Sequence, residues 1–313
     1  MRPSLSVILP THDRPEHLLR AVESILSQTR LPCELIIVND GRQEIPPQIA
    51  PKVRAAGVSF RLERRSKPSA TASRNLGLSL AAGDVVVLGE DDVTYPPDYF
   101  HRLTEMYEAD TEHRIGGIGA SVLEPEQRRL GRRIWEAAMA LAPHSRFTPR
   151  TWAARYVGLP PALRGRLAPA HYLMGGAMSL RRSVAAEFRF EDSFRGYTYG
   201  EDMEFSFRAG RRFALFFAPG LAIHHCPAPG GRPDMRAFGR LYVERMSYVV
   251  ARSAGGGVGS WLLLGHNFLA RIVIFLTLGA FTRRRLMPAF AVGMIAELLS
   301  RAKRAIRKFL CGC

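Results

Sequence analysis

Apolar residues in the first ninety positions alternate between short runs and helical spacing. Short apolar runs are typical of buried strands, and apolar residues repeated every three or four positions are typical of helices. The expected strands are Leu5–Leu9, Leu35–Val38, Val58–Leu62 and Val85–Leu88, and the expected helices are residues 18–26 and about 71–82. Repeated strand and helix units predict a mainly parallel sheet flanked by helices, which is an α/β fold.

The last fifty residues show longer apolar segments. Trp261–Phe281 is 21 residues long, enough to cross a bilayer as a helix, but it contains Asn267 and the central Arg271. A charge at that depth costs at least about 2.5 kcal/mol. Between residues 295 and 310, apolar residues repeat at helical spacing and arginines and lysines fill other positions. This pattern predicts a basic amphipathic helix that lies in a membrane interface rather than crossing it. The alternative is an ordinary helical subdomain packed on the catalytic core.

Charge and composition support that interpretation. The chain carries a net charge of +16, and residues 232–313 hold 14 Lys and Arg against 3 Asp and Glu. Because long apolar segments interleave these basic residues, we expect an anionic membrane surface as partner and no nucleic acid. A hydrophobic content of 47% indicates a folded chain. The apolar run at Leu5–Leu9 is too short for a secretory leader, so a cytoplasmic location is expected.

Three polar clusters follow three of the expected strands. They are Thr11–Arg14, Asn39–Gly41 and Glu90–Asp92. Each alone is explained by turn chemistry, helix capping or an acidic loop. In open α/β sheets, however, ligands bind beyond the carboxyl ends of the strands, where all three clusters fall. Three adjacent carboxylates also repel one another unless a cation compensates them. Together the clusters predict a nucleotide and metal site.

Four segments carry a family resemblance in their order and spacing. They read SVILPTHDRPEHLLRAVESILSQ, ELIIVNDG, ATASRNLGLSLAAGDVVVLGEDDV and GEDMEFSFRAGRRFALFFAPGLAIHH. Over about residues 4–225 the chain resembles the family 2 glycosyltransferases with the GT-A fold. The resemblance implies a Rossmann-like, mainly parallel sheet with flanking helices. It also implies transfer of a sugar from a nucleotide-diphosphate donor to an acceptor hydroxyl, with inversion at the anomeric carbon. UDP is the expected nucleotide, and GDP and dTDP are the alternatives.

The resemblance assigns roles on the donor side of the site. The residues that match donor-binding positions are Thr11, Asp13, Arg14, Asp40, Arg74, Glu90 and Asp91. Asp92 matches the position that ligates Mn²⁺ or Mg²⁺, which prefer oxygen ligands. His225 matches a histidine that completes the metal or diphosphate site in some members of the family, and a structural histidine is the alternative. The first residue of the acidic motif departs from the family pattern, because Glu90 stands where an aspartate is usual. A glutamate is one methylene longer, so its contact with ribose or metal is left open. For Arg74, a snorkelling helix side chain is the alternative.

The acceptor side is assigned in the same way. Asp202 matches the family's base, which takes the proton from the acceptor hydroxyl as that oxygen attacks. Glu201, Gly175 and Gly176 match acceptor-binding positions, and glycines permit a close approach of the backbone to a sugar. The alternatives are helix capping for Asp202 and a bulge or tight turn for the two glycines.

These expectations define the organisation of the chain. We expect a GT-A catalytic domain at residues 1–225, with a nucleotide half at about 1–123 and an acceptor half at about 124–225. Residues 226–260 are expected to form a helical linker, and residues 261–313 a basic amphipathic membrane-associated helical region. The expected location is the cytoplasmic face of the cell membrane, as a peripheral or monotopic protein.

The expected function is glycosyl transfer in the assembly of a cell-surface polysaccharide or glycolipid, with a saccharide or lipid-linked acceptor. A non-catalytic nucleotide-sugar-binding scaffold at the membrane is the alternative, and the departure at Glu90 leaves it open. A nucleotidyltransferase would need a glycine-rich triphosphate loop near the N-terminus, and Pro10–Arg14 contains no glycine.

Overall fold

The chain divides into two compact units, each described by itself below. The computed structural model describes residues 2–123, 159–194, 198–227, 234–252, 257–282 and 286–311. The first unit contains the sheet and the helices around it. The second contains the last three helices.

The first unit is built on one mixed sheet. Its strands are β1 (Leu5–Thr11), β2 (Glu34–Asn39), β3 (Ser59–Arg64), β4 (Val85–Leu88), β5 (Val93–Thr94), β6 (Ile115–Leu123), β7 (Ala168–Pro169), β8 (Met178–Arg181) and β9 (Ala214–His225). Within the described residues the strand order is β3-β2-β1-β4-β8-β6-β9-β5, and β7 pairs with β9. Strands β3, β2, β1 and β4 are parallel, whereas β8 runs antiparallel between β4 and β6.

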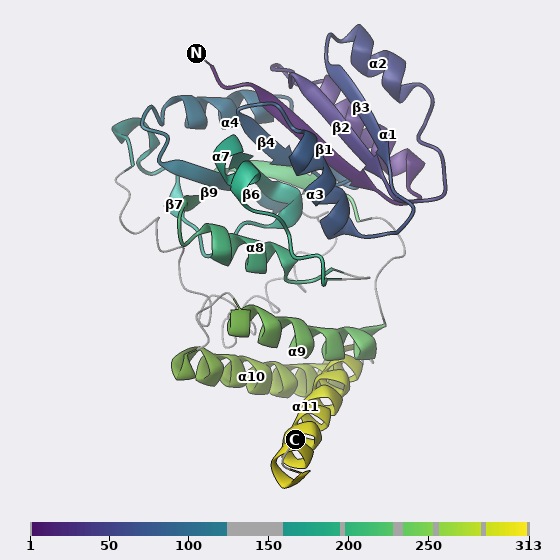
Figure 1. Cartoon of the computed structure of the whole chain (residues 1–313), viewed down its shortest axis with the longest axis vertical. Helices are drawn as coiled ribbons and strands as arrows, with labels where there is room; N and C mark the ends of the chain where they lie inside the picture. The colour runs from purple at the N-terminus through teal and green to yellow at the C-terminus, as the bar shows by residue number, and fades with distance from the viewer. Residues whose placement is uncertain are drawn as a thin grey trace. The chain divides into compact units, whose positions relative to one another are not determined.

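Helices cover both faces of this sheet (Figure 1). They are α1 (Pro15–Leu26), α2 (Ile49–Ala55), α3 (Ala70–Leu80), α4 (Tyr99–Glu108), α7 (Arg182–Glu187) and α8 (Glu201–Ala209). Side chains alternate between faces along a strand, so Leu5, Val7 and Leu9 pack with α1, α2 and α4. Ile8 points to the opposite face, where α3, α7 and α8 lie. Short 3₁₀ turns occur at Pro161–Leu163 and Gly175–Ala177.

The expected α/β fold is confirmed, including its first four strands. The strand expected at residues 85–88 has those bounds in the structure, and the others agree to within a few residues. The helices expected at 18–26 and 71–82 correspond to α1 and α3. Among the described helices of the first unit, α2, α4 and α7 were not expected from the sequence.

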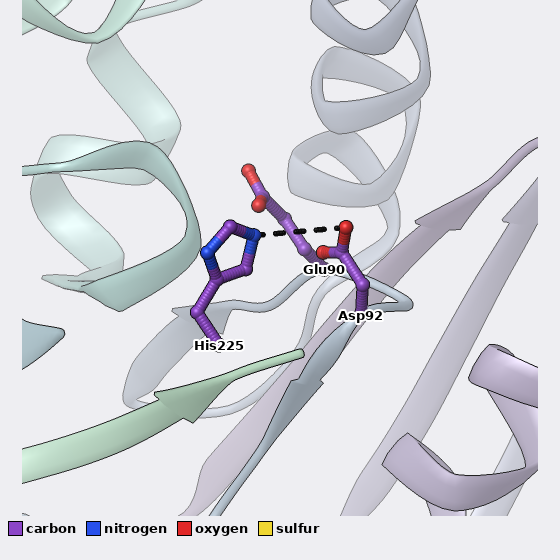
Figure 2. A group of neighbouring side chains, drawn as sticks. All are labelled: Glu90, Asp92 and His225. Atoms are coloured by element: carbon purple, nitrogen blue, oxygen red, sulfur yellow. Dashed lines mark ion pairs between the residues drawn. The ribbon is translucent and has the colours of Figure 1, made fainter. Parts of the chain in front are cut away.

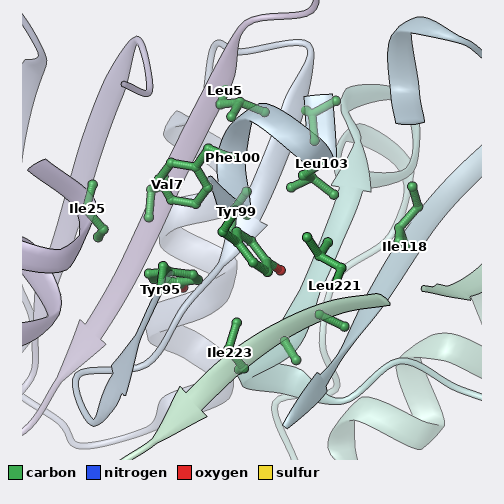
Figure 3. Close-up of a cluster of buried hydrophobic side chains, with 14 of the residues drawn as sticks. Leu5, Val7, Ile25, Tyr95, Tyr99, Phe100, Leu103, Ile118, Leu221 and Ile223 are labelled. Atoms are coloured by element: carbon green, nitrogen blue, oxygen red, sulfur yellow. The ribbon is translucent and has the colours of Figure 1, made fainter. Parts of the chain in front are cut away.

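An aromatic cluster supports the loop that carries the acidic motif. Figure 3 shows Tyr95, Tyr99 and Phe100 packed among aliphatic side chains of the sheet. The ring centroid of Tyr95 lies 5.1 Å from that of Tyr99 and 5.1 Å from that of Phe100. Because Tyr95 follows β5 directly and is buried, this packing anchors the chain just after Asp92.

The second unit consists of three long helices. They are α9 (Met235–Arg252), α10 (Val258–Thr282) and α11 (Leu286–Cys311). Helices α9 and α11 approach so closely that a Cβ added to Gly239 would overlap the carbonyl oxygen of Phe290. A Cβ added to Gly293 would likewise overlap the carbonyl oxygen of Arg236. The interior of the unit is aromatic, with Phe290 stacked on Phe275 at a centroid distance of 4.7 Å. Among the described residues, one segment, Val258–Thr277, is long and apolar enough to cross a membrane.

Candidate active site

The loops after β1, β2 and β4 meet at one edge of the sheet. Thr11, the last residue of β1, pairs in register with Asn39, the last residue of β2. On the other side of β1, Ile8 pairs with Leu88, the last residue of β4. The three polar clusters that follow these strands therefore come together, and their side chains contact one another.

Asp91 ties the first loop to the acidic motif. Its Oδ2 accepts a hydrogen bond of 2.8 Å from Thr11 Oγ1, and its Oδ1 accepts one of 3.1 Å from Arg14 Nη1. The same Arg14 nitrogen lies 3.5 Å from Asp92 Oδ2. Burial raises the pKa of Asp91, and the hydrogen bond from Thr11 opposes that effect. The middle carboxylate of the motif thus connects the loop after β1 to the loop after β4.

Asp13 organises the loop after β2. Its φ of +52° is uncommon for a residue other than glycine. Its Oδ1 accepts hydrogen bonds from the backbone N–H groups of Arg42, at 2.6 Å, and Gln43, at 2.7 Å. The bond from Gln43 lowers the pKa of Asp13. Asp13 therefore carries negative charge while it shapes the second loop of the site.

Asp40 connects the second loop to helix α3. Its Oδ2 accepts hydrogen bonds from the backbone N–H of Ser69, at 2.8 Å, and from Ser73 Oγ, at 2.9 Å. Its Oδ1 lies 3.0 Å from His12 Nδ1. The side chain of Ser69 in turn caps α3 by accepting the N–H of Ala72. One carboxylate oxygen is thus engaged by the helix, while the other faces His12.

Three side chains from two segments form a candidate cation site. One ligand atom from each of Glu90, Asp92 and His225 lies within 4.8 Å of the others. Figure 2 shows the three side chains converging, with Asp92 Oδ2 3.7 Å from His225 Nε2. Pairing of β5 with β9 brings them together, since Val93 is the partner of His225. Neighbouring strand residues point to opposite faces, and His224 is accordingly exposed.

The donor set fits a divalent cation of the manganese or magnesium type. Two carboxylates and one imidazole supply oxygen and nitrogen ligands that suit Mn²⁺, and the carboxylates alone suit Mg²⁺. Burial raises the pKa of Glu90, and the nearby charge of Asp92 acts in the same direction. A bound cation would relieve that repulsion.

Arg74 joins the acidic motif to the start of α8. Its Nη2 donates to Glu90 Oε1 at 2.6 Å, and its Nη1 donates to Glu201 Oε1 at 2.9 Å. Only 4% of Arg74 is exposed, so its side chain points inward and does not snorkel to the surface. Its guanidinium also lies 5.5 Å from the ring centroid of Phe190. Glu90, with 36% of its side chain exposed, is thus held by protein at one end and open to solvent at the other.

The two adjacent glycines lie against this ion-pair network. A Cβ on Gly175 would come within 2.9 Å of Arg74 Nη2, and one on Gly176 within 2.8 Å of the Glu90 carboxyl carbon. Such distances are shorter than side chains tolerate. The glycines form a 3₁₀ turn before β8, and they allow the backbone to pass next to Arg74 and Glu90.

Asp202 lies in the first turn of α8. Its Oδ1 accepts the backbone N–H of Met203 at 2.8 Å, and its Oδ2 accepts that of Gly175 at 3.3 Å. Burial, together with the neighbouring charge of Glu201, raises the pKa of Asp202 to about 7. A carboxylate with such a pKa is suited to accept a proton near neutral pH. The contact with Met203 shows that Asp202 also takes part in the helix start.

Asn75 supports the site, although no role was expected for it. Its side chain donates to the carbonyl oxygen of Phe190 at 2.9 Å and accepts the N–H of Phe190 at 2.7 Å. This pairing fixes the ring that packs under Arg74. Ser69 and Ser73 were likewise unassigned, although a serine just before a helical pattern is a capping signal.

The match to a family model decides the classification. The model for glycosyl transferase family 2 matches residues 6–188. This chain belongs to glycosyl transferase family 2. The match includes the three polar loops and Arg74, whereas Asp202 and His225 lie beyond its end.

Two curated relatives and one solved structure illustrate the similarity. An uncharacterized glycosyltransferase, YwdF of Bacillus subtilis, is 34% identical over 112 residues, covering 35% of this chain and 40% of the relative. The hyaluronan synthase of Pasteurella multocida is 24% identical over 241 residues, covering 72% of this chain and 25% of the synthase. The chain therefore matches well under half the length of these relatives.

The solved structure supports the fold. It is the mannosyltransferase PcManGT of Pyrobaculum calidifontis, in complex with GDP-Man and Mn²⁺. Its TM-score is 0.56 at 13% sequence identity, and the alignment covers 95% of this chain and 88% of that one. The family 2 chain thus has the GT-A-like fold that its sequence resemblance implied.

Proposed function

We propose that this family 2 member is an inverting, metal-dependent glycosyltransferase that moves a sugar from a nucleotide-diphosphate donor to an acceptor hydroxyl. One observation carries the proposal: the buried Arg74 guanidinium contacts both Glu90 and Glu201. Glu90 belongs to the candidate cation site, and Glu201 precedes the candidate base Asp202. The Arg74 guanidinium thereby holds the donor side and the acceptor side of the site in a fixed geometry, as a displacement between two bound substrates requires.

On the donor side, Glu90, Asp92 and His225 would hold Mn²⁺ or Mg²⁺. When bound, such a cation stabilises the negative charge that develops on the departing nucleoside diphosphate. Thr11 and Arg14 hold Asp91, which keeps Asp92 turned towards His225. The Mn²⁺ in the mannosyltransferase with the same fold supports this assignment.

On the acceptor side, Asp202 takes the proton of the attacking hydroxyl. The acceptor oxygen forms a bond to the anomeric carbon as the bond to the diphosphate oxygen breaks. A single displacement of this kind inverts the configuration. Gly175, Gly176 and Glu201 are proposed to line the acceptor position, since Gly175 donates its N–H to Asp202 and Glu201 is adjacent to it.

Asp40 is proposed to recognise the donor base, and its contacts favour a pyrimidine. Ser69 and Ser73 already engage Oδ2, which leaves Oδ1 as the acceptor beside His12. Uracil and thymine each present one imide N–H, whereas guanine presents an N–H and an amino group that pair best with both carboxylate oxygens. These contacts favour uracil or thymine over guanine, and we propose UDP as the donor nucleotide, with dTDP as the alternative.

Calorimetric binding of UDP, GDP and dTDP, each with and without Mn²⁺, tests the site. We expect Mn²⁺ to strengthen UDP binding to the wild type, and Asp92→Ala to weaken it by more than about tenfold, because a cation ligand is lost. Asp98→Ala, at an exposed carboxylate next to α4, is the matched control and should bind as the wild type does. Binding that is indifferent to Mn²⁺ would contradict the cation site. Nucleotide binding without transfer to any acceptor would favour the non-catalytic scaffold, and no nucleotide binding at all would contradict both functions.

The pH dependence of transfer tests the base. Because Asp202 must be deprotonated to accept a proton and its pKa is about 7, kcat/KM should fall about tenfold per unit as the pH drops below 7. Above pH 7 we expect a plateau. The control is nucleotide affinity at about pH 6 and 8, since donor binding does not need that proton. A profile that is flat through neutrality would contradict the assignment.

We propose that the enzyme works at the cytoplasmic face of the cell membrane in assembly of a cell-surface polysaccharide or glycolipid. The basic excess in residues 232–313 supports attachment to an anionic surface. Similarity to a hyaluronan synthase supports a saccharide acceptor, and attachment to a membrane motivates a lipid-linked one. Transfer to lipid-linked rather than free saccharide, measured with radiolabelled donor, separates the two acceptor classes.

A further inference from the structure

Helix α10 carries large apolar side chains on its outer side, and on its inner side two polar side chains lie among the buried residues Leu264, Phe268, Ile274 and Phe275. Inside the helical unit lie Asn267, 1% exposed, and Arg271, 6% exposed. On the outside lie Leu262, 70% exposed, and Leu269, 63% exposed. Val273 and Leu276 are exposed as well. Large apolar side chains normally occupy the interior, so this outer face needs an apolar environment.

The inward polar groups satisfy one another. The Tyr242 hydroxyl of α9 donates to Asn267 Oδ1 at 2.7 Å, and Arg271 Nε donates to the same oxygen at 3.2 Å. The Arg271 guanidinium lies 5.0 Å from the ring centroid of Tyr242. These residues therefore tie α10 to α9, which runs beside it in Figure 1, and both polar side chains of α10 contact protein.

Four of the exposed apolar residues of α10 lie on one side of the helix. Leu262, Leu269, Val273 and Leu276 are separated by seven, four and three positions, which places them on one side of a helix. We call these four residues the α10 stripe. A helix that lies in a membrane interface buries one apolar face in lipid, and the α10 stripe is such a face.

Charges on α9 argue against α10 crossing the bilayer. Tyr242 holds α9 beside the middle of α10, and α9 carries exposed Arg236, Arg240 and Glu244. Carrying α10 through the hydrocarbon would bring these charges with it, and each costs at least about 2.5 kcal/mol at the bilayer centre. An orientation parallel to the surface leaves α9 on the aqueous side.

Charge on α11 identifies the surface as anionic. Lys303, Arg304 and Arg307 are exposed in its second half. Glu297 is already paired with Arg301 and Arg304, both at 3.0 Å. A second copy of this chain would bring the same positive charge to the contact, whereas anionic headgroups would neutralise it.

We propose that α10 lies in the plane of an anionic bilayer surface, with the α10 stripe among the acyl chains and the basic second half of α11 at the headgroups. The inference deepens the proposed function, on which it rests for the presence of a membrane. It moves the main apolar contact from α11, where the sequence placed it, to α10.

Flotation of the full-length protein with vesicles tests the proposal. Phosphatidylcholine vesicles with and without phosphatidylglycerol are compared, and the wild type should float mainly with the anionic ones. Leu269→Asp should weaken vesicle binding by about tenfold or more, because a leucine is lost from lipid and a charge is added. Leu31→Asp makes the same change at an exposed leucine of the first unit and should bind as the wild type does. Equal binding of Leu269→Asp and wild type would overturn the proposal.

Arg271→Leu separates an in-plane helix from a crossing one. If α10 crossed the bilayer, removing its central charge would strengthen membrane retention. In the plane, Arg271 contacts protein, so the variant should bind vesicles no more tightly and should have a lower Tm. Tighter retention would overturn the proposal.

Oligomeric state and nucleotide binding distinguish a lipid contact from a contact between copies of the chain. Size-exclusion chromatography of Leu269→Asp detects a change in oligomeric state; a dimer converted to a monomer with vesicle binding unchanged would assign the stripe to a contact between copies. UDP binding by the same variant should equal that of the wild type. Loss of vesicle binding with UDP binding retained supports the membrane surface, while absence of UDP binding in the wild type would count against the proposed function alone.

Discussion

Replacing Asp202 with asparagine is expected to lower kcat by about 10²–10⁴-fold, which is the contribution typical of a positioned general base. Asparagine has nearly the shape of aspartate, and its carbonyl oxygen can still accept a hydrogen bond from Gly175 or Met203. It cannot take a proton from the acceptor hydroxyl. The measurement is initial-rate transfer with saturating donor, alongside calorimetric binding of UDP.

Donor binding by the same variant distinguishes a base from a donor ligand. Donor affinity should change by less than about twofold, since Asp202 acts on the acceptor. Asp98→Asn, the same change at an exposed carboxylate, should leave both rate and binding unaltered. A normal rate in Asp202→Asn would remove Asp202 as the base. Lost donor binding in a normally folded variant would assign Asp202 to the donor side instead.

The first ninety residues show what local sequence can predict about this fold. Strands β1, β2 and β4 are buried apolar runs, and α1 carries a long helical repeat, so each pattern is complete within its own segment. Helix α2 spans seven residues, with Ile49 and Val53 as its buried pair, and one such pair is too short a signal. The antiparallel strand β8 enters between β4 and β6 from far along the chain, and such non-local pairing has no local signature.

Some features of the site could likewise be predicted from local sequence, whereas others depend on contacts between distant segments of the chain. The polar loops could be placed because each follows its strand directly. The contacts of Arg74 could not, since its partner Glu201 is 127 positions away. The resemblance assigned Arg74 to the donor-binding residues, and the structure pairs it with two carboxylates. Mean hydropathy along α10 has a similar limit, because it averages over all sides of the helix. Arg271 lowers that mean, although its side chain is buried inside the helical unit and does not face the surroundings.

Replacing Arg74 with methionine is expected to lower the free energy of unfolding by about 3 kcal/mol, as for a buried ion pair that loses one partner. Methionine fills most of the arginine volume, but it leaves Glu201 buried without its cation. Glu90 is better solvated, so the Glu201 contact should dominate the loss. Arg74→Lys should recover only part of it, because one ammonium cannot reproduce a fork that donates to two carboxylates from separate nitrogens. Urea unfolding measures all three proteins.

A surface arginine serves as the control, because its replacement also removes an ion pair but does not leave a buried carboxylate without its partner. Arg212 pairs with Glu187 at the surface, and Arg212→Met should cost no more than about 1 kcal/mol. Equal destabilisation by the two methionine variants would mean that the Arg74 network adds nothing beyond a surface pair. If Arg74 also sets the position of Glu90, then Arg74→Met should weaken Mn²⁺-dependent UDP binding even at temperatures where the variant is fully folded, whereas Arg212→Met should not. Lower stability together with weaker Mn²⁺-dependent UDP binding would show that the Arg74 guanidinium both stabilises the catalytic unit and aligns its two carboxylate partners. A purely structural arginine would alter unfolding and leave the Mn²⁺ dependence of UDP binding unchanged.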